Sequence, residues 1–352
     1  MGEHAVVYGR PALAAAIDLR LTVRVAPWER GRVRLDLPCL PHAEETSWSE
    51  VLAYSRAARE SWREYSREPG PERFRAVRGE DPAHIVKAAL GEAAEALDET
   101  GPPGIPGITL RVESRLPIGS GFGSSAATAV GVVAGYLTFR GEDLDPGRIE
   151  RLALEAERRQ HGLPSGIDTA AVLRGGLLWA RRLPSGELET ERITLRTSRS
   201  PLLSRLRVYD TGTPPEPTGA VVAAVGALRD RDPARHERLL DGIEAAVRAF
   251  RDELARPRED PARIVQTIRD CEGCLEEMGV VPGPVREIVR RIEAEGGAAK
   301  ISGAGSLAGP GAGSLLIYHP EVEEISGWLF LQPFPFHPVH LGAEGLRLET
   351  DA

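Results

Sequence analysis

The segment LPIGSGFGSSAATAVGVVAGYL, residues 116–137, constrains the fold more than any other stretch of the chain. Gly119, Gly121 and Gly123 alternate with other residues, and two serines then open a run of alanine and valine. Glycine tolerates positive φ and lets a ligand approach the main chain closely. The apolar run predicts a buried helix over 124–139, and a strand over 108–112 precedes the loop. The free N–H groups and positive dipole end of such a helix point at the loop.

This order of strand, glycine loop and helix N-terminus favours binding of an anion, and phosphate is the usual one. The alternative is a flexible turn before a buried helix. Spacing excludes two common phosphate loops. No lysine ends the loop as in a Walker motif, and Ser124 stands where a dinucleotide fingerprint needs its third glycine. Ser124 and Ser125 instead place hydroxyls in the first helical turn, where either could ligate Mg²⁺.

A second polar segment, HGLPSGID, ends in Asp168, and Glu157 lies eleven residues earlier on a predicted helix. A carboxylate in a glycine-containing loop could act as a general base toward a hydroxyl. A carboxylate on the neighbouring helix could hold Mg²⁺. The alternative for Asp168 is the N-cap of a helix over 169–173, and the two roles are compatible.

A third segment, KISGAGSLAGPGAGSLLIY at 300–318, is dense in glycine between two predicted strands. It is either a hairpin connection or a second loop that closes over nucleotide phosphates. One CxxC, Cys271–Cys274, has no partner pair for a zinc site, so small core residues on one helix face are favoured. Trp328, Phe330, Phe334 and Phe336 are expected in the core or at a dimer contact.

The whole chain limits the function classes. Its length of 352 residues favours two domains. Its net charge of −8 gives no sign of nucleic-acid binding. The N-terminus lacks a basic region followed by an apolar stretch, and no run of about 18 apolar residues suits a membrane span. Three cysteines favour a reducing compartment, so we expect a cytoplasmic protein that binds no membrane.

Apolar periodicity predicts an α+β chain. Strands are expected over 5–7, 19–25, 33–37, 108–112, 176–181, 205–209, 298–302, 314–318 and 340–348. Helices are expected over 47–65, 84–97, 124–139, 146–159, 169–173, 218–228, 234–254, 262–278 and 284–295. Helical patterns dominate after about residue 197.

Four motifs now occur in one chain in a recognisable order: GEHAVVYGRPALAAAID at 2–18, PIGSGFGSSAA at 117–127, HGLPSGIDTA at 161–170 and KISGAG at 300–305. Together they resemble the mevalonate kinase family of the GHMP kinase superfamily, and they are spread over the whole chain. A glycine loop without the Walker lysine is typical of the superfamily. GEHAVVYG and HGLPSGID are the parts that favour mevalonate kinases.

The resemblance implies an α+β fold of two domains with the active site in the cleft between them. The N-terminal domain, 1–198, would hold a left-handed βαβ unit, and the C-terminal domain, 199–352, would be ferredoxin-like. The implied reaction transfers the γ-phosphoryl group of ATP to the 5-hydroxyl of (R)-mevalonate and gives 5-phosphomevalonate for isoprenoid precursor synthesis. ATP and Mg²⁺ are the implied cofactors, and the resemblance leaves a homodimer open.

The resemblance also assigns roles to residues. Asp168 corresponds to the catalytic aspartate that accepts the hydroxyl proton, and Ser125 and Glu157 correspond to Mg²⁺ ligands. Residues beside mevalonate correspond to Glu3, His4, Asp168 and Thr218. Residues around ATP correspond to Pro117, Gly119, Ser120, Gly121, Phe122, Gly123, Ser124, Ser125 and Ala126 in the first loop and to Gly303, Ala304 and Gly305 in the third.

The sequence departs from the family pattern in two places. Family members usually carry a lysine six residues before the glutamate that corresponds to Glu3, and this lysine pairs with the catalytic aspartate. The sequence given starts too late to include it, so we expect either an upstream start or an enzyme that works without it. The third loop is longer and contains Pro310. Two alternatives therefore stay open: another GHMP kinase, such as a phosphomevalonate kinase or one with a shifted acceptor, or a catalytically impaired metabolite-binding paralogue.

Overall fold

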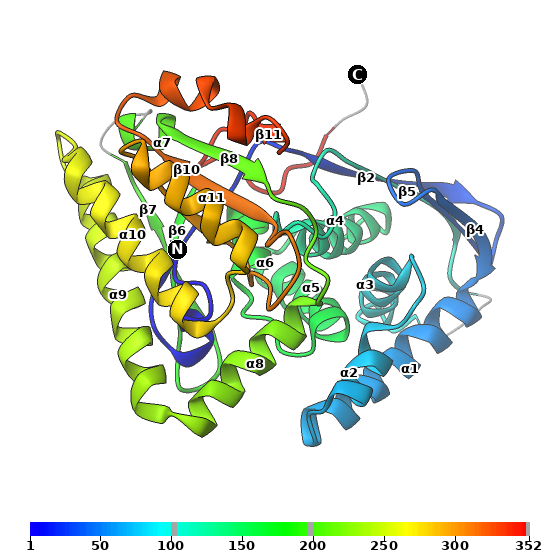
Figure 1. The fold of residues 1–352 in the computed structure, drawn as a ribbon. Coiled ribbons are helices and arrows are strands. Elements are labelled where there is room, and N and C mark those ends of the chain that lie inside the picture. Colours follow the sequence, from blue (N-terminus) through cyan, green and yellow to red (C-terminus); the bar gives the residue numbers. More distant parts are fainter. Residues whose placement is uncertain (100–103, 196–199, 350–352) are drawn as a thin grey trace. The chain divides into compact units, whose positions relative to one another are not determined.

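The computed structural model describes residues 1–99, 104–195 and 200–349, and the chain forms two compact units (Figure 1). Unit 1 comprises Met1–Asp18, Ile118–Phe122 and Gly175–Glu344, and unit 2 comprises Leu19–Pro117, Gly123–Arg174 and the segment from Gly345 onward. The predicted domain boundary between 198 and 199 lies outside the described residues and stays a prediction. The chain passes from unit 2 to unit 1 and back within the predicted phosphate loop.

Unit 2 is built on one four-stranded sheet of order β2-β5-β3-β4. Strand β5 pairs antiparallel with β2 and parallel with β3. The strands are β2 Leu21–Trp28, β3 Arg32–Leu37, β4 His42–Ser47 and β5 Gly107–Ser114. The helices are α1 Trp48–Arg67, α2 Pro71–Arg78, α3 His84–Glu95, α4 Ser124–Phe139, α5 Pro146–His161 and α6 Ile167–Arg174.

Local sequence explains where two of these helices begin. Ser47 and Glu50 form a capping box at the start of α1, in which each side chain accepts from the backbone N–H of the other residue. Asp145 caps α5 by accepting from Arg148 N, and Pro146 occupies the first helical position, where its missing N–H costs nothing.

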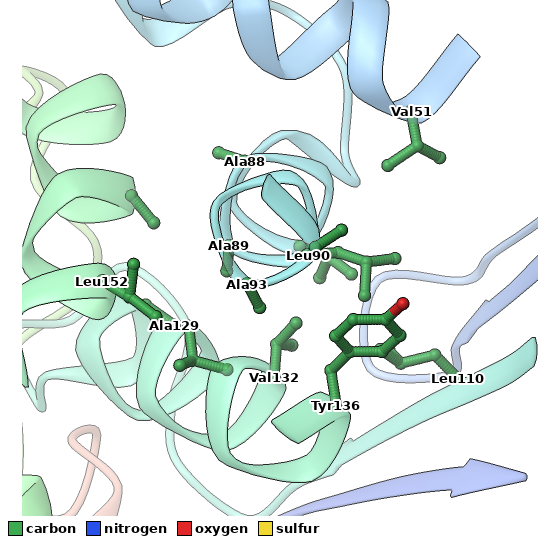
Figure 2. Packing of buried hydrophobic residues seen from close by; sticks show 14 of the residues in the cluster. Val51, Ala88, Ala89, Leu90, Ala93, Leu110, Ala129, Val132, Tyr136 and Leu152 are labelled. Atoms are coloured by element: carbon green, nitrogen blue, oxygen red, sulfur yellow. The ribbon is translucent and has the colours of Figure 1, made fainter. Parts of the chain in front are cut away.

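Helices α3, α4 and α5 pack on one another through small side chains (Figure 2). Ala89 and Ala93 of α3 lie near Ala129 and Val132 of α4 in the buried core of this unit. Glycines allow closer contacts still. A Cβ at Gly131 of α4 would lie 2.7 Å from Val23 Cγ2 of β2. Close approach of α4 to the sheet therefore depends on small residues, and it fixes where the first turn of α4 lies.

Unit 1 contains two sheets, with orders β1-β6-β7 and β11-β8-β10-β9. In the second sheet β8 is followed by helices, then β9 and β10, then short 3-10 helices and β11, and all three pairings are antiparallel. This succession and strand order are those of a ferredoxin-like fold. The strands are β1 Ala12–Ala15, β6 Leu177–Arg182, β7 Leu188–Ile193, β8 Leu206–Asp210, β9 Ala298–Ser302, β10 Ser314–Tyr318 and β11 Phe336–His337.

The helices of unit 1 cover the ferredoxin-like sheet with an aliphatic core. They are α7 Pro201–Ser204, α8 Thr218–Arg231, α9 Pro233–Ala255, α10 Pro261–Met278 and α11 Gly283–Ala294, and α9 and α10 run side by side (Figure 1). Cys271 of α10 is buried in this core and Cys274 packs against it, as expected for small core residues. Trp328 is buried there too, whereas Phe336 is exposed and lies against Tyr209.

Three sequence predictions are wrong. Residues 5–7 form the 3-10 helix η1, Ala5–Tyr8, because His4 turns the chain with a φ of 60° and Gly9 closes the turn with a left-handed φ. Residues 340–348 form no strand; Leu341 makes only an isolated bridge to Ile17, and the next two backbone N–H groups both donate to Ala16 O. Asp168 is the second residue of α6, so it is not the N-cap of that helix.

None of the described helices is both long enough and apolar enough to cross a membrane.

Candidate active site

The first part of the glycine loop, Ile118–Phe122, packs in unit 1 against the third glycine segment. Gly119 and Gly121 have φ values of 78° and 76°, which favour glycine. A Cβ at Gly121 would lie 2.9 Å from Ser302 O, and one at Gly303 would lie 3.4 Å from Gly121 Cα. Gly121 and Gly303 are therefore required by close backbone packing of the two loops as well as by their dihedral angles.

Thr211, at the end of β8, holds the third glycine segment in place. Its hydroxyl donates to Gly313 O at 2.7 Å and accepts from Ala312 N at 2.9 Å. Ser314 N, one residue further on, donates to Ser120 O at 2.9 Å. The first and third segments are thus joined by this main-chain hydrogen bond. Sequence reasoning missed Thr211, although it stands in the TGTPPEPT stretch that contains Thr218.

Residues of the first motif also contact the third segment. The Lys300 ammonium is buried and lies 2.6 Å from Glu3 Oε1. Burial acts against the charged carboxyl, but the positive charges of Lys300 and the N-terminal ammonium, together with hydrogen bonds, outweigh it and lower the pKa of Glu3 to about 2. His4 Nε2 donates to Ala304 O at 2.8 Å, and this fixes a non-glycine residue at a φ of 60°. Residues with strained backbone dihedral angles of this kind are found mostly at functional sites.

The remaining predicted residues of unit 1 are placed as follows. Thr218 is the first residue of α8 and is exposed. The Phe122 ring packs edge-on against His337, with 5.1 Å between ring centroids.

The second part of the loop, from Gly123, belongs to unit 2 and starts α4. Gly123 is left-handed with a φ of 71°, and no side chain caps this helix end. Asp168 of α6 lies beside it, because a Cβ built on Gly123 would be 3.7 Å from Asp168 Cβ and 3.9 Å from its Oδ1. The N–H groups in the first turn of α4 and the Asp168 carboxylate therefore adjoin the same glycine.

Ser125 in the first turn of α4 meets the end of α5. Its Oγ is hydrogen bonded to His161 Nε2 at 2.8 Å, and His161 Nε2 lies 3.9 Å from Glu157 Oε2. Glu157 is buried, and among the described residues its Oε1 has no hydrogen-bond partner. Burial raises the pKa of Glu157 to about 7, although the hydrogen bond from Ser125 acts in the opposite direction.

A buried carboxylate oxygen without a partner costs free energy unless a cation or donor meets it. Ser125 and Glu157 offer the oxygen donors that Mg²⁺ prefers. These two residues therefore fit a divalent cation, and the fit rests on the orphaned Glu157 oxygen rather than on the motif alone.

Both lysines of the chain have partners of their own. Lys300 pairs with Glu3, and Lys87 of α3 lies 2.6 Å from Asp81 Oδ2 and 2.8 Å from Glu44 Oε1. His42 completes a group of three possible metal-binding side chains with Glu44 and Asp81, but the Lys87 ammonium already forms an ion pair with both carboxylates.

Comparisons with known proteins agree with the motifs. Residues 84–176 match the model of the GHMP kinases N terminal domain. The mevalonate kinase of Methanothermobacter thermautotrophicus is 28% identical over 91% of this chain and 86% of that protein. A solved structure of a mevalonate kinase superposes with a TM-score of 0.72 at 18% identity, covering 98% of this chain and 96% of the other.

A crystal structure of L. major mevalonate kinase in complex with R-mevalonate superposes with a TM-score of 0.64 at 21% identity, covering 93% of this chain and 86% of the other. The domain match, the near full-length similarity and the shared fold agree with one another. Residues 84–176 therefore resemble the N-terminal domain of GHMP kinases, and nearly the whole chain is similar to mevalonate kinases, which are small-molecule kinases.

Proposed function

We propose that this chain transfers the γ-phosphoryl group of ATP to the 5-hydroxyl of (R)-mevalonate and so forms 5-phosphomevalonate for isoprenoid precursor synthesis. The observation that carries the proposal is the group of side chains around the first turn of α4. An uncapped helix end, the Asp168 carboxylate and the Ser125–Glu157 pair all lie in one small region of unit 2. Similarity to mevalonate kinases over nine tenths of the chain supplies the acceptor.

Phosphoryl transfer needs positioning and charge neutralisation more than covalent help from the protein. The residues at 117–126 and 303–305 bind the nucleotide, and the free N–H groups of α4 take the phosphate charge. Ser125 and Glu157 would hold Mg²⁺, which would neutralise phosphate charge when bound. Asp168 accepts the proton of the attacking hydroxyl.

Glu3, His4 and Thr218 are assigned to the acceptor. Within this group, Glu3 and His4 are held by different contacts. Glu3 Oε1 is held in a buried ion pair with Lys300, which fixes this carboxylate, and its Oε2 has no hydrogen-bond partner among the described residues. His4 is fixed by the Ala304 carbonyl, so its ring has one orientation toward any ligand. Preorganisation of this kind lowers the entropy that binding costs.

An acceptor panel tests the proposal. Purified protein is incubated with Mg²⁺-ATP and, separately, mevalonate, phosphomevalonate, galactose or homoserine, and acceptor-dependent ADP release is measured. We expect release with mevalonate at least about 100-fold above the other acceptors, because a site built for one hydroxyl acceptor rejects compounds that leave its polar groups unpaired.

Two other outcomes decide against the proposal. Activity with phosphomevalonate and none with mevalonate would assign a different GHMP kinase. ATP binding without ADP release for any acceptor would favour a metabolite-binding paralogue.

A further inference from the structure

His161, the last residue of α5, lies beside the two side chains that we assign to Mg²⁺. Glu157 and His161 are four residues apart in one helix and therefore face the same way. Ser125 approaches them from α4. A glutamate and a histidine at this spacing, joined by an oxygen from a second helix, offer one face of a metal coordination sphere.

The distances suit one cation. Neighbouring ligand atoms around an octahedral ion with bonds of roughly 2.1 Å lie about 3 Å apart. Ser125 Oγ and His161 Nε2 are 2.8 Å apart, and His161 Nε2 and Glu157 Oε2 are 3.9 Å apart. The second distance is too long for a hydrogen bond. An ion between these atoms would contact Glu157 Oε2, while the other carboxyl oxygen, Oε1, is buried without a hydrogen-bond partner among the described residues.

His161 and Glu157 offer two kinds of ligand atom to a cation, an imidazole nitrogen and an oxygen of a buried carboxyl group.

We propose that His161 Nε2 is a third protein ligand of the divalent cation, next to Ser125 Oγ and Glu157, and that it makes the site favour cations which accept nitrogen ligands. The proposal rests on the proposed function only in taking Ser125 and Glu157 as the cation site. Mg²⁺ prefers oxygen ligands, whereas later first-row cations such as Co²⁺ bind imidazole well. The site should therefore bind Co²⁺ more tightly than an all-oxygen site would.

The test compares Co²⁺ and Mg²⁺ binding to the full chain by calorimetry, with Co²⁺ as the spectroscopic probe. His161→Gln keeps a polar group near Ser125 but removes the imidazole nitrogen. We expect the Co²⁺ dissociation constant to rise roughly 10- to 100-fold and the Mg²⁺ constant to change less than about 3-fold. Wild type loaded with Co²⁺ should show a hyperfine-shifted imidazole N–H proton in its NMR spectrum, and His161→Gln should not.

Two further variants place the site. Glu157→Gln should weaken both cations, and His340→Gln, at a histidine that is 90% exposed in unit 1, should weaken neither. Equal weakening of Co²⁺ and Mg²⁺ by His161→Gln would overturn the proposal, because a structural role alone would do that. Absence of the shifted proton in wild type, or Co²⁺ binding that survives Glu157→Gln, would overturn it as well.

Turnover measured on the same samples separates the two proposals. If wild type phosphorylates mevalonate but shows no hyperfine-shifted imidazole proton, the assignment of His161 is overturned and the proposed function stands. A shifted imidazole proton without phosphorylation of any acceptor supports the ligand assignment and contradicts the proposed function.

Discussion

Buried charges beside the third glycine segment show how single residues shape this protein. Lys300 is fully buried and is paired with Glu3, and Glu272 of α10 lies close enough to feel its charge. Glu272 Oε2 accepts from Ile301 N at 3.0 Å, while its Oε1 has no partner among the described residues. Burial raises the pKa of Glu272 to about 8, although Lys300 and the Ile301 N–H act against this. Glu272 is therefore protonated at neutral pH.

The shift of Glu272 predicts a pH-dependent stability. Between pH 4.5, which is the ordinary pKa of this carboxyl group, and about pH 8, the folded chain holds a proton that the unfolded chain has lost. The free energy of unfolding therefore falls as the pH rises through this range. Glu272→Gln removes this dependence. We expect the variant to gain stability relative to wild type from pH 5 to 8, by at most about 1.4 kcal/mol per pH unit, and no further above pH 8. Thermal unfolding midpoints from pH 5 to 9 measure this.

Glu277→Gln is the control, because it makes the same exchange at an exposed position of the same helix. A difference between wild type and Glu272→Gln that stays constant over the whole pH range would contradict the prediction.

At this scale the sequence singled out part of the candidate site. It named Asp168, Ser125 and Glu157, because each stands in a local motif with a recognisable spacing, and their roles stay predictions. It did not predict the ion pair between Glu3 and Lys300, whose partners are 297 residues apart. It also missed the two hydrogen bonds of Thr211. Neither pattern nor periodicity records which distant segments fold together.

At the scale of elements, two glycines inside helices differ in whether helix packing requires them. Gly91 of α3 faces α1, and a Cβ on it would lie 2.3 Å from both Cβ and Oγ of Ser55. Gly273 of α10 is also in a helix interior, but a Cβ there would meet nothing within 4 Å. The first glycine sets the distance between two helices, whereas the second only adds backbone freedom to the unfolded chain.

Replacing each of these glycines by alanine should change stability in opposite directions. Gly91→Ala should destabilise the fold by about 1–3 kcal/mol, because Ser55 is buried and α3 has to move away from α1. Gly273→Ala should stabilise it by about 0.5–1 kcal/mol through the higher helix propensity of alanine. Urea unfolding of both variants beside wild type provides the comparison, and a stabilised Gly91→Ala would disprove the packing argument.

Long elements were predictable from the sequence, and short ones only in part: β9 and β10 were predicted with their bounds, but others were missed. Periodicity predicted α4, α9 and α10 within about two residues, because each is long and opens at a clear boundary. The short strands β1 and β7 were missed, and 5–7 was assigned to the wrong type. A run of three or four apolar residues suits a strand and a 3-10 turn equally, so tertiary hydrogen bonds such as those of His4 decide between them.

At the scale of the whole molecule, similarity to mevalonate kinases extends over nearly the full chain, whereas the family model covers residues 84–176 alone. Superposed structures with less than 25% sequence identity support the fold but do not identify the acceptor. The ferredoxin-like order β11-β8-β10-β9 matches the expectation drawn from the motifs. The acceptor and the role of Asp168 therefore need a kinetic test.

Steady-state turnover of wild type and Asp168→Asn with Mg²⁺-ATP and (R)-mevalonate tests the central claim most directly. Asparagine keeps the shape of the side chain but cannot accept the hydroxyl proton, so we expect kcat to fall about 10²- to 10⁴-fold while ATP still binds. A wild type that phosphorylates mevalonate and an Asp168→Asn variant with an unchanged kcat would contradict the assignment of Asp168, and a wild type inert toward mevalonate would contradict the proposed function itself.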